Sequence, residues 1–385
     1  MALDLIALER RLIGFDTTSR NPNLALVDFL CEQLKALGLG VEVDRSEDGQ
    51  KANVFATLGP PDASGLMLAG HMDTVPVEGQ AWHTDPFTLT ERDGRFYGRG
   101  TADMKSFIAQ ALLAAEALRS RKLKLPLHLA FTYDEEVGCD GAEHLMHMLR
   151  GGGRAMPGCA VVGEPTNFGV FRMHKGFHAG RVTVTGVEGH SSKPGKGANA
   201  IYAAAKVIAR MVEVEQERKR HRSMEEFFEV PHTTLNVGTI SGGTALNIIP
   251  NHAQVGFEYR TMPGEDPDFV LNQVRGYVSE VLLPEFRKQQ PEVDIQVELT
   301  VQGQPMMTPA GAAIETLALE LTGQQRSTAA PYYTEGAIYN EAGIPTVICG
   351  PGDIDQAHRP NEFVTREQLE KGVTFLGRLI ERVCL

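Results

Sequence analysis

Short apolar segments alternate with helical patterns along the first 176 residues, and this alternation constrains the fold more than any other feature. Strand-like runs at 66–69, 127–132 and 160–162 are separated by helical patterns, including an Ala- and Leu-rich stretch at 104–119. The same alternation resumes toward the C-terminus, with a strand at 346–348 and a helix at 366–383. It is typical of α/β proteins, so we expect a mostly parallel sheet with helices on both faces.

The order of patterns changes between these two parts. Residues 177–302 read as strand, helix, two strands, helix and strand, which is the β-α-β-β-α-β order of ferredoxin-like domains. A chain of 385 residues also exceeds what one hydrophobic core usually organises. We therefore expect one α/β domain built from residues 1–176 and 303–385, interrupted by a ferredoxin-like α+β domain at 177–302.

Histidine and acidic residues follow the predicted strands of the larger domain where each strand ends, except Asp103, which precedes the Ala-rich helix near its N-terminus. In parallel sheets ligands bind outside these ends, so side chains from distant segments converge there. Mixed imidazole and carboxylate ligands suit divalent metal ions. The sequence thus predicts a site for two divalent cations, and the candidates are His71, Asp73, Asp103, Glu135, Glu136, Glu164 and His358.

Each candidate taken alone has a simpler interpretation, because a single acid or histidine after a strand is more often a cap or a solvated loop residue. Glu135 and Glu136 carry the strongest signal, since adjacent like charges repel unless a cation or proton separates them. Their alternative is an exposed helix N-terminus, where acids are also stabilised. Asp73 is placed to accept the imidazole N–H of His71, and Glu135 to take a proton from an activated water.

Charge and composition exclude several other classes of function. With 37 basic and 49 acidic residues the net charge is -12, which disfavours nucleic acid and anionic membranes as partners. No apolar run reaches the roughly 18 residues of a membrane span, and the N-terminal pattern is amphipathic rather than a signal peptide, so we expect a cytoplasmic protein. A nucleotide-dependent oxidoreductase is disfavoured because the glycine fingerprint around Gly98 and Gly100 is incomplete.

Five segments resemble the dinuclear-zinc aminoacylase and carboxypeptidase family: GHMDTVP, GRGTADMK, DEEVG, GEPT and GHSSKPGKGANA, in the family order. The resemblance implies that His71, Asp103 and Glu164 hold one metal ion and that Asp103, Glu136 and His358 hold the other. Zinc is the metal it implies, although cobalt or manganese would suit the same ligands. Glu135 would be the general base, Asp73 the orienting acid, and the peptide bond after Asp103 would be cis.

The resemblance also assigns roles outside the metal ligands. It implies a homodimer formed by the inserted domain, with His190 stabilising the oxyanion in the partner's site, and Arg260 and Asn247 binding the substrate α-carboxylate. Residues 82–105 and 334–363 are most similar to members that deacetylate N2-acetyl-L-ornithine, giving L-ornithine for arginine synthesis and acetate. Glu335 would then contact the δ-ammonium group.

Several alternatives stay open for the activity. Within the family they are a succinyl-diaminopimelate desuccinylase, a deacylase of another N-acyl amino acid, and a dipeptidase. A catalytically silent scaffold of the same fold is disfavoured, because the expected base and every expected ligand are present in the sequence.

Overall fold

A computed structural model describes residues 3–385, and these residues form two compact units. The first unit contains the described residues up to Met173 together with Met306–Ala329 and Thr334–Leu385. The second contains His174–Pro305 and the short segment Ala330–Tyr333. The boundaries at Met173 and Met306 lie three residues from those expected at 176 and 303, whereas the sequence did not indicate that 330–333 joins the second unit. The division into an α/β domain and an inserted ferredoxin-like domain stays a prediction.

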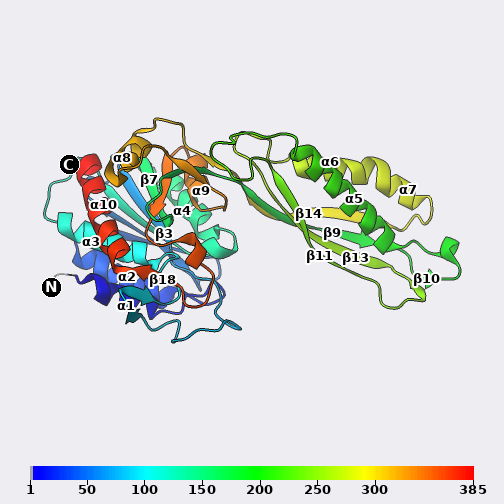
Figure 1. Ribbon diagram of the computed structural model, residues 1–385, viewed down its shortest axis with the longest axis horizontal. Helices are drawn as coiled ribbons and strands as arrows, with labels where there is room; N and C mark the ends of the chain where they lie inside the picture. Colours follow the sequence, from blue (N-terminus) through cyan, green and yellow to red (C-terminus); the bar gives the residue numbers. More distant parts are fainter. Residues whose placement is uncertain (1–2) are drawn as a thin grey trace. The chain divides into compact units, whose positions relative to one another are not determined.

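A nine-stranded sheet forms the centre of the first unit (Figure 1). Its order is β1-β2-β6-β3-β7-β17-β8-β15, with β16 paired to β8, and the central strands β6, β3, β7 and β17 are parallel. Those four strands are almost wholly buried, as expected where helices cover both faces of a sheet. The strands are β1 (Gly40–Arg45), β2 (Ala52–Leu58), β3 (Leu66–His71), β6 (Leu127–Thr132), β7 (Cys159–Pro165), β8 (Phe171–His174), β15 (Met306–Met307), β16 (Thr328–Ala330) and β17 (Thr346–Gly350).

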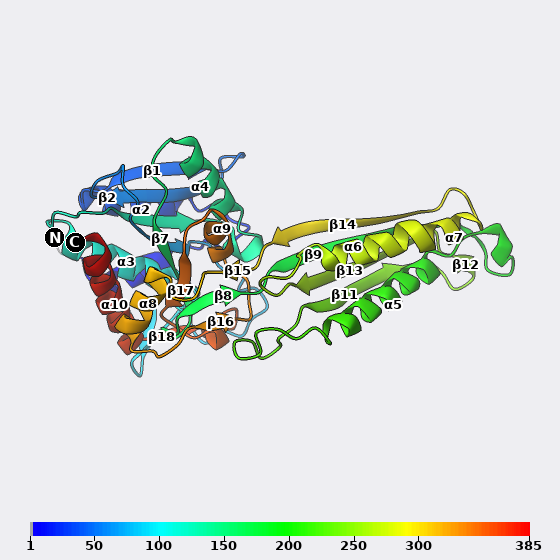
Figure 2. The same ribbon diagram turned by 90° about the horizontal axis from the view of Figure 1, so that it is seen from above.

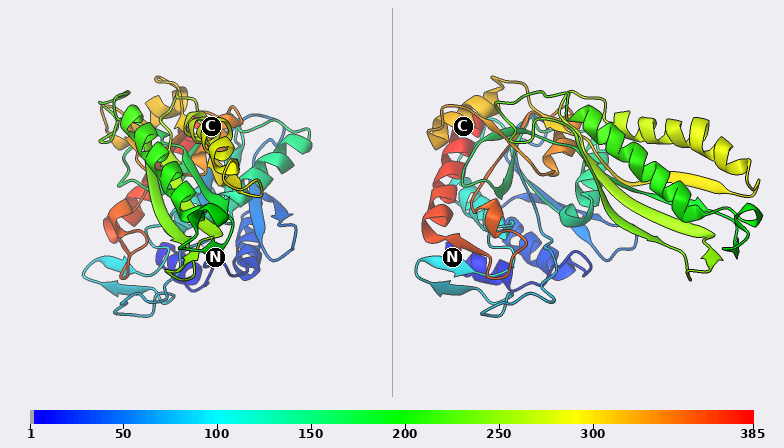
Figure 3. Two further views of the ribbon diagram at one scale, coloured as in Figure 1. Left: turned by 90° about the vertical axis from the view of Figure 1, so that its right-hand side faces the viewer. Right: turned by 45° about the vertical axis from the view of Figure 1, so that its right-hand side comes forward.

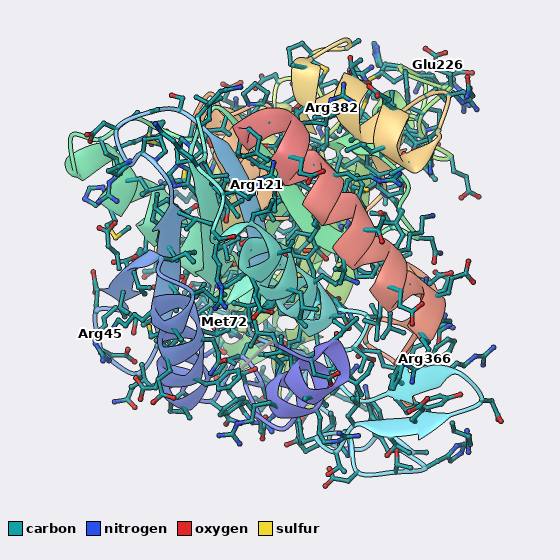
Figure 4. The ribbon with its side chains drawn as sticks, turned by 90° about the vertical axis from the view of Figure 1, so that its left-hand side faces the viewer. Arg45, Met72, Arg121, Glu226, Arg366 and Arg382 are labelled. Atoms are coloured by element: carbon teal, nitrogen blue, oxygen red, sulfur yellow. The ribbon has the colours of Figure 1, made fainter. Side chains whose placement is uncertain are left out.

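Helices pack against this sheet and build its core. They are α1 (Leu5–Ile13), α2 (Leu24–Ala36), α3 (Lys105–Leu118), α4 (Asp140–Gly151), α8 (Ala313–Thr322), α9 (Gly336–Glu341) and α10 (Arg366–Cys384). Figure 4 shows α10, from Arg366 to Arg382, running beside α3. Thr365 begins α10 with a reciprocal capping box to Gln368, which satisfies two N–H groups that the helix leaves open. The expected α/β class, with a mostly parallel sheet and helices, is confirmed.

A three-stranded sheet joins two distant parts of the chain. It contains β4 (Thr90–Arg92), β5 (Arg95–Tyr97) and β18 (Phe363–Thr365), in the order β18-β5-β4. Pairing of Tyr97 with Phe363 brings the loop before Asp103 to the loop after His358. Strands this short have no periodic signal in the sequence, and none of the three was expected.

The second unit contains an antiparallel four-stranded sheet in the order β11-β13-β9-β14 (Figure 2). Its elements follow the expected β-α-β-β-α-β order, with helices α5 and α6 along the sheet (Figure 3). A separate two-stranded ribbon pairs β10 with β12. The elements are β9 (Phe177–Thr185), β10 (Gly189–His190), α5 (Ala200–Arg218), β11 (Thr234–Gly242), β12 (Ile248–Ile249), β13 (His252–Arg260), α6 (Phe269–Tyr277), α7 (Leu283–Arg287) and β14 (Asp294–Gly303).

The single helix expected at 268–286 is wrong in one respect. The structure has α6, then a π-helical turn at Val278–Leu282, then α7. Pro284 lies at the start of α7, and because proline has no N–H the regular hydrogen-bond ladder cannot run through it.

Across the described residues, no helix has both the length and the apolar character that a bilayer span requires.

Candidate metal centre

Three neighbouring strands deliver acidic and histidine side chains to one edge of the central sheet. His71 ends β3, opposite Thr132 at the end of β6, and the register Ala69 to Val162 places Glu164 of β7 level with it. Glu135 and Glu136 follow β6 in a 3-10 turn. Because β6, β3 and β7 are parallel and adjacent, their carboxyl ends meet at this edge.

Asp103 lies between the two histidine rings. Its Oδ1 is 3.0 Å from Nε2 of His71, and its Oδ2 is 3.3 Å from Nε2 of His358. Nε2 of His358 is also 3.0 Å from Oε2 of Glu136, and Nε2 of His71 is 3.8 Å from Oε1 of Glu164. One carboxylate thus faces an imidazole on each side, which is the placement that a bridging ligand needs.

The cluster contains two groups whose potential ligand atoms lie within 4.8 Å of one another: His71 with Glu135 and Glu164, and His71 with Asp103 and Glu136. The structure therefore brings together all the predicted ligands, and Glu135 with them. The peptide bond between Asp103 and Met104 is cis, as the family resemblance implied.

Asp73 contacts the imidazole of His71, but through its backbone carbonyl more closely than through the carboxylate that we expected. Nδ1 of His71 lies 2.9 Å from the backbone carbonyl oxygen of Asp73, while the carboxylate Oδ1 of Asp73 is 3.5 Å away. The carboxylate accepts the backbone N–H groups of Glu135 and Glu136, at 3.1 and 3.2 Å, and the hydroxyl of Ser19. Asp73 therefore orients both the imidazole and the acidic turn. No motif in the sequence pointed to Ser19, which lies 54 residues from Asp73.

The acidic side chains of the cluster are buried close to one another. Burial raises the pKa of Glu135 and of Glu164 well above the usual value, and neighbouring carboxylates add to the effect. Burial and the adjacent Asp103 raise the pKa of Glu136 to about 7. Burial also opposes ionisation of Asp103, but hydrogen bonds with His358 and His71 outweigh it and lower that pKa.

Two buried carboxylate oxygens in this cluster have no hydrogen-bond partner among the described residues: Oε1 of Glu136 and Oε1 of Glu164. Buried carboxylates are normally paired, so orphaned oxygens beside two imidazoles fit divalent cations. The donor set of nitrogen and oxygen is one that zinc, cobalt and manganese accept. His358 is the exposed member, with a side chain that is 55% accessible.

The predicted site residues of the second unit lie at two separate positions in that unit, with His190 and Asn247 at one and Arg260 at the other. His190 in β10 pairs with Ile248, and the N–H of Ser191 bonds to the carbonyl of Asn247, so His190 and Asn247 lie together. Nδ1 of His190 accepts the N–H of Ser192. Arg260 ends β13, beside Glu258 and over the ring of Phe177. Since β13 has nine residues, its two ends are about 26 Å apart.

Glu335 lies in a fully enclosed position. Its side chain is 0% exposed, and it accepts the hydroxyl of Thr132, at the end of β6, at 2.5 Å. Burial raises its pKa to about 7, against the effect of the Thr132 hydrogen bond. In the described structure this carboxyl is not accessible to solvent. The predicted contact between Glu335 and a substrate ammonium group stays a prediction.

Comparisons with known proteins agree with this geometry. Residues 67–382 match the model of peptidase family M20/M25/M40. The acetylornithine deacetylase of Myxococcus xanthus is 37% identical over 378 residues, covering 97% of this chain and 96% of the relative. That of Pasteurella multocida (strain Pm70) is 35% identical over 364 residues, covering 94% and 92%.

Solved structures of the family share the fold. An M20 metallo-carboxypeptidase from Sulfolobus solfataricus superposes with a TM-score of 0.78 at 18% identity, over 98% of this chain and 99% of that chain. The YXEP protein of Bacillus subtilis, described as a dinuclear metal binding peptidase, gives a TM-score of 0.68 at 16% identity, over 97% and 96%. The chain therefore belongs to peptidase family M20/M25/M40 and is a metal-dependent amidohydrolase, a deacylase or peptidase of that family.

Proposed function

We propose that the protein removes the acetyl group from N2-acetyl-L-ornithine, giving L-ornithine and acetate. Sequence identity of 34 to 37% to proteins named acetylornithine deacetylase, over more than nine tenths of the chain, supports this substrate. The structural observation that carries the chemistry is Asp103 with an imidazole on each side.

The proposed centre holds two divalent ions, with zinc as the proposed metal. His71, Asp103 and Glu164 would hold one ion, and Asp103, Glu136 and His358 the other. Bound there, divalent ions act as Lewis acids and lower the pKa of water toward about 7. The nitrogen and oxygen ligands, and the orphaned oxygens of Glu136 and Glu164, support this assignment.

Glu135 is the proposed general base. It takes a proton from the attacking water and delivers it to the amide nitrogen, so that the C–N bond breaks and the amine leaves neutral. Burial, with a further contribution from the neighbouring carboxylates, raises the pKa of Glu135 and favours the protonated state needed for the second step. Asp73 holds the backbone at this position by accepting the N–H of Glu135.

Arg260 is the proposed partner of the substrate α-carboxylate, with Asn247 adding a hydrogen bond and His190 stabilising the oxyanion. Arg260 ends β13, whereas His190 pairs with Ile248, which precedes the opposite end of that nine-residue strand. The strand is about 26 Å long, so one copy of the second unit cannot touch one small substrate with both. We therefore propose that the protein works as a homodimer in which His190 and Asn247 serve the partner's site.

A substrate panel tests the proposal. Zinc-loaded protein is supplied with N2-acetyl-L-ornithine, N5-acetyl-L-ornithine, N-succinyl-diaminopimelate, N-acetylmethionine and a dipeptide, and amine release is measured. We expect the highest kcat/KM for N2-acetyl-L-ornithine and none for its N5 isomer, whose amide lies at the wrong end. A higher value for the succinyl compound or the dipeptide would replace the proposed substrate by one of these alternatives.

A further inference from the structure

A buried carboxylate, Glu362, holds the backbone that carries Asp103. Its side chain is 0% exposed. One oxygen, Oε1, accepts three backbone N–H groups, from Gly100 at 3.0 Å, Ala102 at 2.7 Å and Asp103 at 3.0 Å. Charge-assisted hydrogen bonds of this kind are about twice as strong as neutral ones. The backbone of the loop that carries Asp103 is therefore hydrogen-bonded at three positions to a single oxygen atom of Glu362.

The second oxygen of Glu362 reaches the other side of the cluster through two more side chains. Oε2 accepts a hydrogen bond from Nη1 of Arg99 at 2.6 Å, and Arg99 is only 1% exposed. Nη2 of Arg99 donates to Oε1 of Gln80 at 2.7 Å, and Nε2 of Gln80 donates to the backbone carbonyl of His358 at 3.0 Å. The indole of Trp82 covers the guanidinium at 5.1 Å.

His358 needs such support because its backbone has a positive φ of 63°, a conformation that side-chain-bearing residues rarely adopt. The chain Glu362, Arg99, Gln80 therefore connects the backbone of Asp103 with that of His358 by hydrogen bonds. It also explains the segment Gly98-Arg99-Gly100, which lacks the pattern of a nucleotide-binding turn. Arg99 in this segment binds a carboxylate of the protein itself.

We propose that Glu362 is a positioning residue that fixes the separation of Asp103 and His358, with Arg99 and Gln80 relaying its effect. The inference rests on the proposed metal role of Asp103 and His358. A purely structural role would make Glu362 matter for stability alone. A positioning role makes it matter for cation affinity as well, since partners that orient metal ligands usually contribute about 10- to 100-fold in affinity.

The test uses Glu362→Gln, which keeps the shape but removes the charge, in the full-length protein. Two readouts are needed besides activity. Hydrogen exchange of the metal-free protein, over a peptide covering 98–104, reports whether the three N–H groups are released. Titration with Co²⁺, followed by its visible spectrum and by competition with a chelator, reports the ligand geometry and the affinity.

Glu315→Gln is the matched control. Glu315 is also buried in the first unit, lies 3.5 Å from Arg172, and accepts the backbone N–H of Gly311. Its hydrogen bonds do not reach Asp103 or His358. We expect both variants to lose stability. Only Glu362→Gln should exchange faster over 98–104, bind Co²⁺ at least about tenfold more weakly and change the cobalt spectrum.

Glu362→Gln that binds Co²⁺ with wild-type affinity and spectrum would overturn the inference. If this variant does not fold, Gln80→Leu decides, because Gln80 is partly exposed and its loss leaves the Glu362 contacts in place. We expect a changed cobalt spectrum and weaker binding there, and an unchanged spectrum with unchanged affinity would overturn the relay. A wild-type protein that binds Co²⁺ but cleaves no N-acyl amino acid contradicts the proposed function and leaves this inference standing.

Discussion

At the scale of single residues, the proposed proton carrier is distinct from the metal ligands. Glu135 is held by the carboxylate of Asp73 through its backbone N–H, so its side chain is free to move protons. Replacing it with Gln keeps the volume and removes the base. We expect kcat to fall by about 10²–10⁴-fold, the usual contribution of a general base, with metal content unchanged by elemental analysis.

Glu135→Asp is the companion variant, because it keeps the carboxyl one methylene farther back. Partial activity of the Glu135→Asp variant, together with almost no activity of the Glu135→Gln variant, supports proton transfer by Glu135. Equal activity in wild type and Gln would remove Glu135 from the mechanism.

A second residue-scale prediction concerns Glu9, which is 0% exposed on α1. Its carboxyl is 3.1 Å from the Ser106 hydroxyl, whose single proton is also directed at the carbonyl of Thr101 at 2.6 Å. A protonated Glu9 satisfies both contacts. Burial accordingly raises its pKa from 4.5 to about 8, with the Ser106 hydrogen bond opposing this.

The direction in which Glu9 changes folding stability with pH follows from how many protons the folded and unfolded chains bind. Between pH 4.5 and 8 the folded protein keeps a proton on Glu9 that the unfolded chain releases, so this group makes stability fall as pH rises. Glu9→Gln has no such proton. Its stability relative to wild type should increase by about 1.4 kcal/mol per pH unit in this window, measured by urea unfolding with a chelator at about pH 6 and about pH 7.5. A pH-independent difference would show that Glu9 is ionised in the folded protein.

At the scale of elements, close packing of α3 on β7 positions Glu164. A Cβ on Gly163 would lie 1.9 to 2.4 Å from the ring of Phe107 in α3, so no side chain fits there. We expect Gly163→Ala to cost about 1–3 kcal/mol of stability through overpacking and to weaken cation binding, because Glu164 is the next residue. Thermal unfolding and metal titration measure the two effects.

Gly377→Ala in α10 is the control for that prediction, since no atom lies within 4 Å of the added Cβ. Alanine favours a helix by up to about 1 kcal/mol over glycine, so this variant should be as stable as wild type or more so. If Gly163→Ala is as stable as Gly377→Ala and binds the cation with wild-type affinity, Phe107 moves aside and the packing does not position Glu164.

The sequence predicted the elements that have a periodic signal and missed those that depend on distant partners. The buried apolar runs of β3, β6, β7 and β17 identified the parallel sheet. β5 and β18 have three residues each and pair across more than 260 positions, so neither contains a local pattern. The π-helical turn before Pro284 arises from the proline's missing N–H and was also missed.

The same distinction holds for the site. His71, Glu135, Glu136 and Glu164 follow recognisable strands, and their meeting place could be predicted from topology. Glu362 could not be singled out in this way. Three of its contacts are backbone N–H groups about 260 positions away, and only the tertiary fold brings them to its carboxylate.

At the scale of the whole molecule, the proposed chemistry requires two copies of the chain. If His190 serves the partner's site while Arg260 serves its own, His190→Ala and Arg260→Ala protomers should complement each other. Each variant alone should be nearly inactive. After unfolding, mixing and refolding in equal amounts, half of the dimers are mixed and each has one intact site, so about a quarter of wild-type activity should return.

Absence of recovery, with mixed dimers demonstrated by differently tagged chains, would contradict sharing of sites between subunits. Two Arg260 variants mixed with each other, for example Arg260→Ala with Arg260→Gln, are the control, because neither can supply the missing guanidinium.

The proposed chemistry depends above all on a pair of cations enclosed by five remote segments of the chain. Anomalous X-ray diffraction from zinc-loaded crystals locates such ions without reference to activity. We expect two peaks about 3.5–4 Å apart, one beside His71 and Glu164, the other beside Glu136 and His358, with Asp103 touching both. A single peak, or peaks away from Asp103, would contradict the two-ion centre.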